Sequence, residues 1–579
     1  VLVRKLLGIE TSGSLTILFT DKTGTLTQGS LNVSEFLSGD GKHFNDFEEI
    51  PELLKEKVAF SLRNNTTVSI DLDDKINPKI IGANPTEKAL LSFIGSSLLE
   101  KEKVKMTKHI PFKSSYKFSA SQIQIPHNII LVKGAAEMIL KNCKTFLNTK
   151  GEKINLDSKK IEEKMKNLSD RAMRLIGLAF SDNDISLENS LPSELTLLGI
   201  FGLRDEIRKE SKSAVENAQK AGIQVVMITG DAKDTAQAIA KEVGILENKK
   251  NTILTSKELE DLKDDEIKNI LPDLRVVARA LPTDKSRLVK IAKSLNWVVG
   301  MTGDGVNDAP AVKNADVGFA MGNGTDMTKE SSDIVILDNN FNSLTNAVRY
   351  GRTLFKSIRK FLVFQLTVNV AAVLVTFLGP FFGTDLPLTM TQLLWVNIVM
   401  DTLAAFAFSG ESALRRYMSE KPIPKNEKLI TIDMWSAILV NGIFMAILSL
   451  FFLNSDFVAS LFLCDENRCS DSEKNIVLMT AFFGFFVFIN NFNKFNARTD
   501  GLNLFENITE NRGFILVVLI IFSLQTAFTY LGGEVLRTVG LTLEEWLYVL
   551  VFSLSIIPLD LLRKYLRNLL IGNPVVKNI

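Results

Sequence analysis

An aspartate at the end of a buried strand is the residue of this chain best placed to act as a nucleophile. The apolar run at residues 15–19 predicts a strand that is buried on both faces, as in a parallel sheet. Asp21 follows this strand, and a polar turn with Lys22, Thr23 and Gly24 comes next. Open α/β sheets bind ligands at the carboxyl ends of their strands, so we expect Asp21 in a binding site. The alternative is an aspartate that only caps a turn.

Two later strand ends also carry acidic residues. Thr229, Gly230 and Asp231 close one predicted strand, and the segment 302–308, which contains Asp304, closes another. A hard cation such as Mg²⁺ takes oxygen ligands and shares them with phosphate. The Asp21 carboxylate, the Thr23 carbonyl and Asp304 would supply such ligands.

Lys285 is a candidate for a fixed positive charge at this site. It follows the segment 281–284, at the start of a predicted helix. A lysine there would stabilise a transferring phosphoryl group. An ordinary surface lysine is the alternative.

Strands and helices alternate around these residues. The predicted strands cover residues 195–202, 224–231, 275–279, 297–304, 316–321 and 333–338, with helices at 210–221 and 285–295. This alternation predicts an α/β doubly wound sheet. Residues between the first strand and this region differ in pattern, with helices predicted at 87–99 and 157–168. We therefore expect an inserted domain at 30–194, a first domain made of 1–29 and 195–345, and a membrane domain at 346–579.

The composition excludes several functional classes. The formal net charge is +1, which gives no basic surface for nucleic acid. The three Cys and three His show no CxxC or HExxH spacing, so zinc and thiol chemistry are not expected. No GxxxxGK[ST] segment occurs, which argues against a Walker-type ATPase. The chain begins at Val1 without a visible signal peptide, and we expect it to be part of a longer protein.

Two long motifs resemble those of P-type ATPases and, more broadly, of the haloacid dehalogenase superfamily. They are DKTGTLT at 21–27 and TGDGVNDAP at 302–310. The resemblance implies that Asp21 accepts the γ-phosphoryl group of ATP as an aspartyl phosphate, with Thr23 and Lys285 assisting. It also implies that Mg²⁺ is bound by Asp21, Thr23, Asp304 and Asp308.

The insertion resembles the α+β nucleotide-binding domain of the same family. The positions that match its ATP-binding residues are Glu87, Phe112, Lys117, Lys133, Gly134 and Arg174 in the insertion, and Thr229, Gly230, Asp231, Asp205 and Arg208 in the first domain. Each alone would be ordinary surface or core, and their shared order favours nucleotide binding. Residues 203–208 read LRDEIR where the family has Asp-Pro-Pro-Arg, so the prolines that would stiffen this hinge are absent.

Six apolar runs follow, at 361–383, 388–410, 434–454, 476–492, 513–532 and 543–562. Most are near the ~20 residues that a membrane-spanning helix needs. Lys and Arg follow the second, fourth and sixth runs, and the loops between carry acidic residues. The positive-inside rule then predicts an all-α, multi-pass domain with the ATP-binding domains in the cytoplasm. Cys464 and Cys469 would face outward, where a disulfide can form, and Cys143 stands alone.

Asp401 lies in the middle of an apolar run. A carboxylate at this depth is costly, which points to a cation site. Asn397 lies four residues earlier, on the same face of an α-helix, and Asn369 is a third candidate. Carboxylate and amide oxygens suit Ca²⁺. The alternative is an aspartate that pairs with a neighbouring helix.

The first two apolar runs, the second of which contains Asp401, sharpen the resemblance. Residues 361–372 and 394–401 look like the fifth and sixth helices of plasma-membrane-type Ca²⁺ pumps. Ala372 stands where sarcoplasmic-reticulum-type pumps carry a Glu, which implies one Ca²⁺ per cycle. The family's Thr-Gly-Glu-Ser loop does not occur in this chain, so we expect the actuator domain and first four helices to precede it. No basic calmodulin-binding tail is visible in this chain.

The sequence therefore predicts an ATP-driven Ca²⁺ pump of a cell membrane. One alternative is a pump for Mn²⁺ or a monovalent cation. Another is a membrane regulatory protein derived from a pump, against which the intact Asp21, Thr23, Lys285 and Asp304 argue. The six apolar runs exclude a soluble phosphatase.

Overall fold

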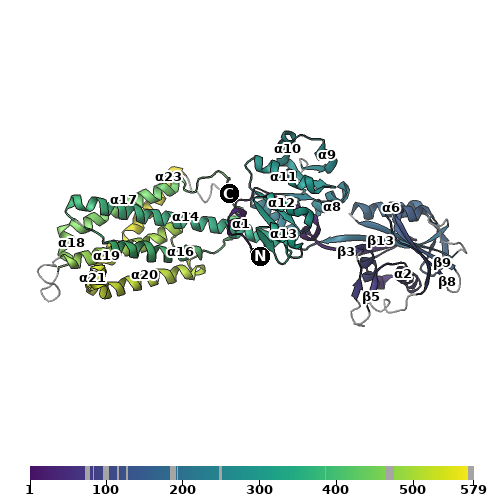
Figure 1. Ribbon diagram of the computed structural model, residues 1–579, viewed down its shortest axis with the longest axis horizontal. Coiled ribbons are helices and arrows are strands. Elements are labelled where there is room, and N and C mark those ends of the chain that lie inside the picture. The colour runs from purple at the N-terminus through teal and green to yellow at the C-terminus, as the bar shows by residue number, and fades with distance from the viewer. Residues whose placement is uncertain are drawn as a thin grey trace.

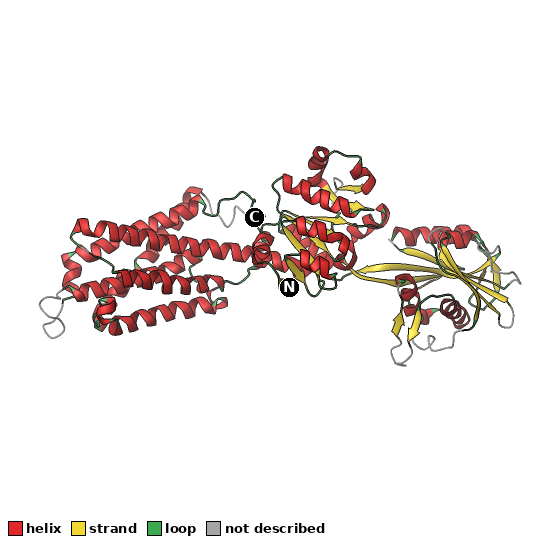
Figure 2. Cartoon of the chain, in the orientation of Figure 1, coloured by secondary structure: helices red, strands yellow, loops and turns green. Residues whose placement is uncertain are grey.

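Three domains lie in a row in the protein (Figure 1). The computed structural model describes residues 1–71, 79–82, 84–95, 104–113, 116–124, 128–171, 173–182, 191, 194–246, 251–384, 386–463 and 475–571. A helical bundle forms one end, an α/β domain the middle and a strand-rich domain the other end, and the strands of the described residues all lie in the last two domains (Figure 2). The N-terminus lies at the middle domain.

The middle domain is built on an eight-stranded sheet. In spatial order its strands are β1 (Leu2–Val3), β19 (Ile334–Ile336), β18 (Val317–Met321), β17 (Val299–Gly303), β2 (Ile17–Asp21), β14 (Gln224–Ile228), β16 (Leu274–Ala278) and β15 (Thr252–Thr255). Only β1 is antiparallel to its neighbour among these described strands. Separate apolar cores lie against the two faces of the sheet. The predicted doubly wound fold is confirmed, and β2 lies between β17 and β14, where the strand order reverses.

Helices connect these strands. They are α1 (Leu6–Ser12), α7 (Ser211–Lys220), α8 (Lys233–Glu242), α9 (Ser256–Glu260), α10 (Asp264–Ile270), α11 (Pro282–Ser294), α12 (Ala309–Asn314) and α13 (Asp326–Ser331). The predicted helices at 210–221 and 285–295 correspond to α7 and α11.

The strand predicted at 195–202 does not belong to this sheet. It forms β13 (Leu195–Ile207), which pairs with β3 (Thr27–Ser38) and with strands of the outer domain. Its first nine residues are all buried. An apolar run of this kind predicts a buried strand but not the sheet that buries it, so the sequence assigned it to the wrong sheet.

The outer domain is a nine-stranded sheet with helices packed on it. The further strands are β4 (His43–Phe44), β7 (Met106–Ile110), β8 (Phe118–Gln124), β9 (Asn128–Ala135), β10 (Cys143–Leu147), β11 (Lys153–Asn155) and β12 (Arg174–Ser181). The main helices are α2 (Glu52–Asn64), α3 (Pro85–Phe93), α5 (Ala136–Lys141) and α6 (Ser158–Asp170), and β5 (Ser69–Asp71) pairs with β6 (Lys79–Ile81). Asn84 and Asp157 cap α3 and α6 with their side chains, which fixes where these two predicted helices begin.

The described part of the bundle contains six segments long and apolar enough to cross a membrane. They are formed by α14 (Phe341–Leu378), by α15 (Met390–Leu394) with η6 (Trp395–Met400) and α16 (Asp401–Ser409), by α17 (Ile432–Asn454), by α19 (Ile476–Arg498), by α20 (Arg512–Leu531), and by α22 (Leu543–Leu554) with α23 (Ile556–Ile571). They match the six predicted runs. Cys464 and Cys469 lie outside the described residues.

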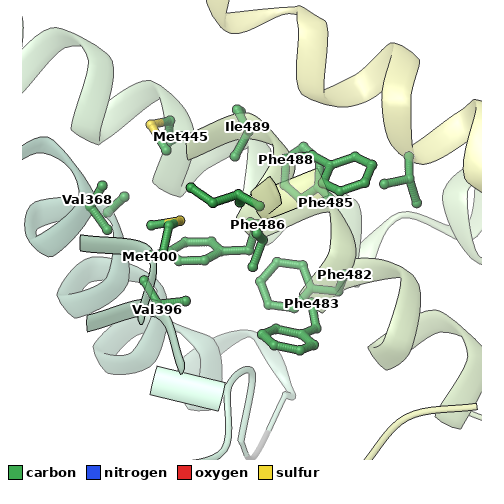
Figure 3. Close-up of a cluster of buried hydrophobic side chains, with 14 of the residues drawn as sticks. Val368, Val396, Met400, Met445, Phe482, Phe483, Phe485, Phe486, Phe488 and Ile489 are labelled. Carbon is green, nitrogen blue, oxygen red and sulfur yellow. The ribbon is translucent and has the colours of Figure 1, made fainter. Parts of the chain in front are cut away.

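Two helices organise the bundle. α14 begins twenty residues before the predicted run at 361 and reaches the middle domain, where it packs against α1 and α7. Helix α19 is the most enclosed segment, with 78% of its most apolar stretch buried. Its phenylalanines pack against Val368 of α14, Val396 and Met400 of η6, and Met445 of α17 (Figure 3). The segments α14, η6 and α17 therefore all pack against one central helix, α19.

Candidate functional site

Asp21 lies at the carboxyl end of the central strand β2, as the sequence predicted. Its backbone N–H donates to the Thr302 hydroxyl on β17 at 3.0 Å. The backbone N–H of Lys22 donates to Asp21 Oδ1 at 2.6 Å, and Lys285 Nζ donates to Oδ2 at 2.6 Å. The carboxylate is thus oriented by neighbours on both sides while it remains half-buried.

Lys285 bridges two carboxylates. Its ammonium donates to Asp21 Oδ2 at 2.6 Å and to Asp308 Oδ1 at 2.7 Å. The side chain is buried near the start of α11. Burial disfavours the charged amine, but the two carboxylates outweigh it and raise the pKa of Lys285. A surface lysine is therefore excluded, and the predicted fixed positive charge is in place.

Three carboxylates converge at this edge of the sheet. Oxygen atoms of Asp21, Asp304 and Asp308 lie within 4.8 Å of one another. Burial, then the charges of Asp21 and Asp308, raise the pKa of Asp304 to about 6, and burial raises the pKa of Asp21. Negative charge is therefore concentrated beyond what Lys285 neutralises, and the all-oxygen donor set fits a hard cation such as Mg²⁺.

The turn η1 (Lys22–Leu26) allows this close approach. Gly24 has φ of 70°, which favours glycine, and a Cβ there would lie 2.9 Å from Asp304 Oδ2. Thr23, the predicted source of a carbonyl ligand, lies in this turn and is exposed. A residue larger than glycine at 24 would push the turn away from Asp304.

Lys22 is a site residue that the sequence analysis did not identify. Its buried ammonium lies 3.1 Å from Asp231 Oδ2 and 3.8 Å from Asp205 Oδ2. Asp231 therefore reaches the same edge of the sheet as Asp21 but pairs with Lys22 there. The signal in the sequence was a lysine directly after Asp21, together with acidic residues at the ends of two later strands.

Asp205 and Arg208 fasten the strands that lead to the outer domain. Asp205 accepts hydrogen bonds from the Thr27 hydroxyl and from the Gly29 backbone N–H, the latter at 2.9 Å. Arg208 Nε donates to the Thr27 carbonyl at 3.0 Å, and its terminal nitrogen donates to the Gly24 carbonyl at 3.4 Å. These side chains hold the connection in the absence of the two prolines.

Glu87 and Lys133 meet in the interior of the outer domain. Their side chains form an ion pair at 2.6 Å, and the residues are 4% and 6% exposed. Glu87 also accepts from Thr66 and Thr67, and Lys133 donates to the Asn65 carbonyl. Burial alone would raise the pKa of Glu87, but Lys133 and the hydrogen bonds lower it. Two residues predicted separately thus form one buried unit.

The other predicted nucleotide residues lie nearer to solvent. Phe112 is 50% exposed, and Lys117 and Arg174 are exposed. Gly134 on β9 faces the Lys117 carbonyl, which would lie 2.5 Å from a Cβ at this position. In the middle domain Thr229 is buried and Gly230 exposed, just after β14. The predicted set is therefore divided between two domains (Figure 1).

In the bundle, Asp401 is 5% exposed and meets Gln365 of α14. The Gln365 amide nitrogen donates to Asp401 Oδ2. Asp401 Oδ1 and Gln365 Oε1 are buried without a hydrogen-bond partner. Gln365 was missed by the sequence analysis, although it lies one helical turn before the predicted Asn369.

Asn397 and Asp401 differ in exposure. Asn397 is exposed, whereas Asp401 is buried, and Asn369 is partly buried. Asn397 lies in η6, a turn of π-helix with wider i→i+5 hydrogen bonds. The α-helical spacing that predicted one shared face does not hold through this turn. The role of the three residues as ligands stays a prediction.

Comparisons with known proteins cover most of the chain. Residues 385–566 match the model of the cation transporting ATPase C-terminus, and residues 54–210 match that of the P-type ATPase cytoplasmic domain N. Residues 285–348 match the haloacid dehalogenase-like hydrolase model. These three matches fall in the bundle, the outer domain and the middle domain.

Curated relatives agree with the family models. The chain is 37% identical over 566 residues to putative calcium-transporting ATPase 13, plasma membrane-type, of Arabidopsis thaliana, covering 94% of this chain and 54% of the relative. It is 34% identical over 590 residues to calcium-transporting ATPase 8 of the same plant, covering 98% and 54%. It is 35% identical over 586 residues to calcium-transporting ATPase 3 of Oryza sativa subsp. japonica, covering 96% and 55%. The chain thus spans about half the length of the curated relatives it matches.

The segments matched by the family models contain the structural features described above. They contain Lys285 and the carboxylates of the 302–310 motif, the outer domain with its Glu87–Lys133 pair, and the six apolar segments of a multi-pass membrane protein. This chain belongs to the P-type ATPase family.

Proposed function

We propose that this chain carries the phosphorylation site, the ATP-binding domain and the cation site of an ATP-driven Ca²⁺ pump. The observation that carries the proposal is the Lys285 ammonium, which lies 2.6 Å from Asp21 and 2.7 Å from Asp308 at the end of the central strand. The names of the curated relatives, calcium-transporting ATPases, support Ca²⁺ as the transported ion.

The chemical step is phosphoryl transfer to Asp21. A carboxylate oxygen of Asp21 forms a bond to the γ-phosphorus of ATP, the bond from that phosphorus to the bridging oxygen breaks, and ADP leaves. Asp21 needs no general base because it attacks as the ionised carboxylate. Lys285 stabilises the charge on the transferring group, and its charge and hydrogen bond oppose the burial that raises the pKa of Asp21.

Mg²⁺ would be held by Asp21, Asp304, Asp308 and the Thr23 carbonyl. When bound, it neutralises negative charge on the phosphates and on the three crowded carboxylates. The raised pKa of Asp304, about 6, reflects burial first and then the charges of Asp21 and Asp308.

ATP binding is assigned to the outer domain together with the edge of the middle domain. Phe112 is exposed and available for stacking against adenine, beside Lys117. Arg174 would meet phosphate, as would Thr229, Gly230 and Asp231 near Asp21. The buried Glu87–Lys133 pair would stabilise this domain from its interior.

The transported ion would bind at Asp401, with Asn397 and Asn369 as further ligands and one Ca²⁺ per cycle. Support comes from the two buried oxygen atoms without donors, Asp401 Oδ1 and Gln365 Oε1, since Ca²⁺ prefers oxygen ligands. Phosphorylation of Asp21 would change the exposure of this site through α14, which packs in both the middle domain and the bundle.

The proposed orientation places the phosphorylation and ATP-binding domains in the cytoplasm and the bundle in a cell membrane. Basic residues follow the second, fourth and sixth apolar segments, as the positive-inside rule requires for this orientation.

The test is labelling of the full-length protein with ATP radiolabelled in its γ-phosphate, while Ca²⁺ is titrated. We expect an acid-stable, hydroxylamine-labile label that requires Ca²⁺ and is absent from the Asp21→Asn variant. A label that depends on another cation would support the phosphorylation mechanism and contradict Ca²⁺ as the transported ion. No label with any cation would contradict the proposed function and favour a regulatory protein.

A further inference from the structure

Helix α19 buries a lysine next to the cation site. Lys494 is 0% exposed, and its ammonium donates to Asn491 Oδ1 at 3.0 Å on the same helix. It also lies 5.3 Å from the centre of the Phe364 ring on α14. Neither partner carries a negative charge, so neither neutralises an ammonium in a low-dielectric interior.

The chemical complement of this ammonium is the Asp401 carboxylate on α16, and α14 packs against both α16 and α19. Phe364, which faces the ammonium, directly precedes Gln365, whose amide donates to Asp401. The Asp401 charge acts on Lys494, and the Lys494 charge acts on Asp401. The lysine and the aspartate therefore belong to one electrostatic unit, contributed by α19 and α16 and joined through α14.

A second buried lysine shows what an ordinary structural pair looks like in this bundle. Lys564 is 1% exposed and lies 3.1 Å from Asp560 on its own helix, where Arg563 and Asn441 also bind Asp560. In that pair the ammonium and the carboxylate are in direct contact. Lys494 and Asp401 differ, because their hydrogen-bond partners in the described residues are the uncharged Asn491 and Gln365 and not each other.

We propose that Lys494 is a tethered counter-cation of Asp401, which neutralises the carboxylate while the transport site is empty and competes with the transported ion for it. This inference rests on the proposed cation site. An ammonium fixed to α19 stabilises the empty site, since an isolated buried carboxylate is costly. The same charge repels an incoming divalent ion and so weakens its binding.

The first test is a double-mutant cycle on thermal unfolding of the full-length protein in detergent, without Ca²⁺. The variants are Lys494→Met, Asp401→Asn and the two together. Lys494→Met should lower the Tm more in the wild-type background than in the Asp401→Asn background. Only in the wild-type background does the loss of Lys494 leave the Asp401 carboxylate without its counter-charge. Equal shifts in the two backgrounds would overturn the proposal. This readout does not depend on activity or on which ion is transported.

The second test is the Ca²⁺ concentration that gives half-maximal labelling of Asp21 by ATP. Lys494→Met should lower it by about tenfold, and Lys494→Arg, which keeps the charge, should leave it within about threefold of wild type. An unchanged or raised Ca²⁺ requirement in Lys494→Met would contradict the proposal.

The matched control is the double change Asp560→Asn with Lys564→Met, which removes a buried lysine and its carboxylate elsewhere in the bundle. This control variant should leave the Ca²⁺ requirement unchanged. If it lowered the Ca²⁺ requirement as much as Lys494→Met does, the Lys494 effect would be non-specific and the proposal would be overturned. Failure of the wild-type protein to show any Ca²⁺-dependent label contradicts the proposed function alone, because the unfolding cycle still decides whether Lys494 and Asp401 are coupled.

Discussion

The guanidinium of Arg352 in α14 donates a hydrogen bond of 2.7 Å to the carbonyl of Ala221, at the end of α7 in the middle domain. The same side chain donates to the carbonyls of Gly13, Tyr417 and Glu420, and it is 3% exposed. One buried cation therefore joins α14, the middle domain and the loop that follows α16.

Replacing Arg352 should uncouple these parts. Arg352→Met leaves the carbonyls without donors, at roughly 1–3 kcal/mol for each group that water does not reach. We expect a lower Tm and faster proteolysis at residues 411–431, measured on the purified protein. Arg415→Met, at an exposed arginine of the same loop, is the control and should change neither quantity. An unaltered Tm in Arg352→Met would contradict this role.

Lys285→Met should slow phosphorylation of Asp21 by about 10²–10³-fold, the usual effect of losing a donor that stabilises transition-state charge. The measurement is the rate of label transfer from ATP at saturating Mg²⁺. Lys290→Met provides the control on the same helix, because Lys290 is exposed. A loss of less than tenfold would show that Lys285 serves the fold and not the reaction.

The Glu87–Lys133 pair predicts a pH dependence of stability. Because the pKa of Glu87 is lowered below its usual value of 4.5, its contribution is present above pH 4.5 and is lost as the pH falls through the lowered pKa. Lys133→Met leaves the carboxylate unpaired, which costs about 3–5 kcal/mol. We expect the Tm of this variant to rise on acidification from pH 7 to 5, where wild type changes little.

Thermal melts across this pH range test the pair. Lys141→Met, at an exposed lysine of α5, should behave like wild type. If Lys133→Met and wild type responded to pH in parallel, Glu87 would not be the group that titrates.

Mg²⁺ binding should weaken below about pH 6, where protons compete for Asp304. The pKa of this carboxylate is raised from 3.8 to about 6 in the folded protein, so its contribution to stability falls as the pH rises through this interval. Bound Mg²⁺ reverses that loss. The rise in Tm on adding Mg²⁺ should therefore be larger at pH 7.5 than at pH 5.5. Asp304→Asn should remove the difference between the two pH values.

The sequence predicted the parts of the site that depend on local pattern. Asp21 was placed correctly because a buried strand and a polar turn meet there, and Lys285 because its helix follows a strand. The helices α3, α6, α7 and α11 were predicted from their periodicity and begin close to where expected.

The errors came from information that local pattern does not contain. The apolar run of β13 predicts a strand but not its partners, which are β3, β10 and β12. The π-helical turn η6 changes which side chains share a face with Asp401. Lys22, Gln365 and Lys494 gain their roles from residues far along the chain, so only the folded structure reveals them.

Two antiparallel, hydrogen-bonded strands, β3 and β13, connect the outer domain to the middle domain. A single flexible linker would let that domain turn freely about its own axis. Two hydrogen-bonded strands restrict that rotation, because the domain is then attached through two segments and not through one. The outer domain can thus swing toward Asp21 while presenting the same side to it on each approach. A nucleotide bound to the outer domain would therefore approach Asp21 in a restricted range of orientations.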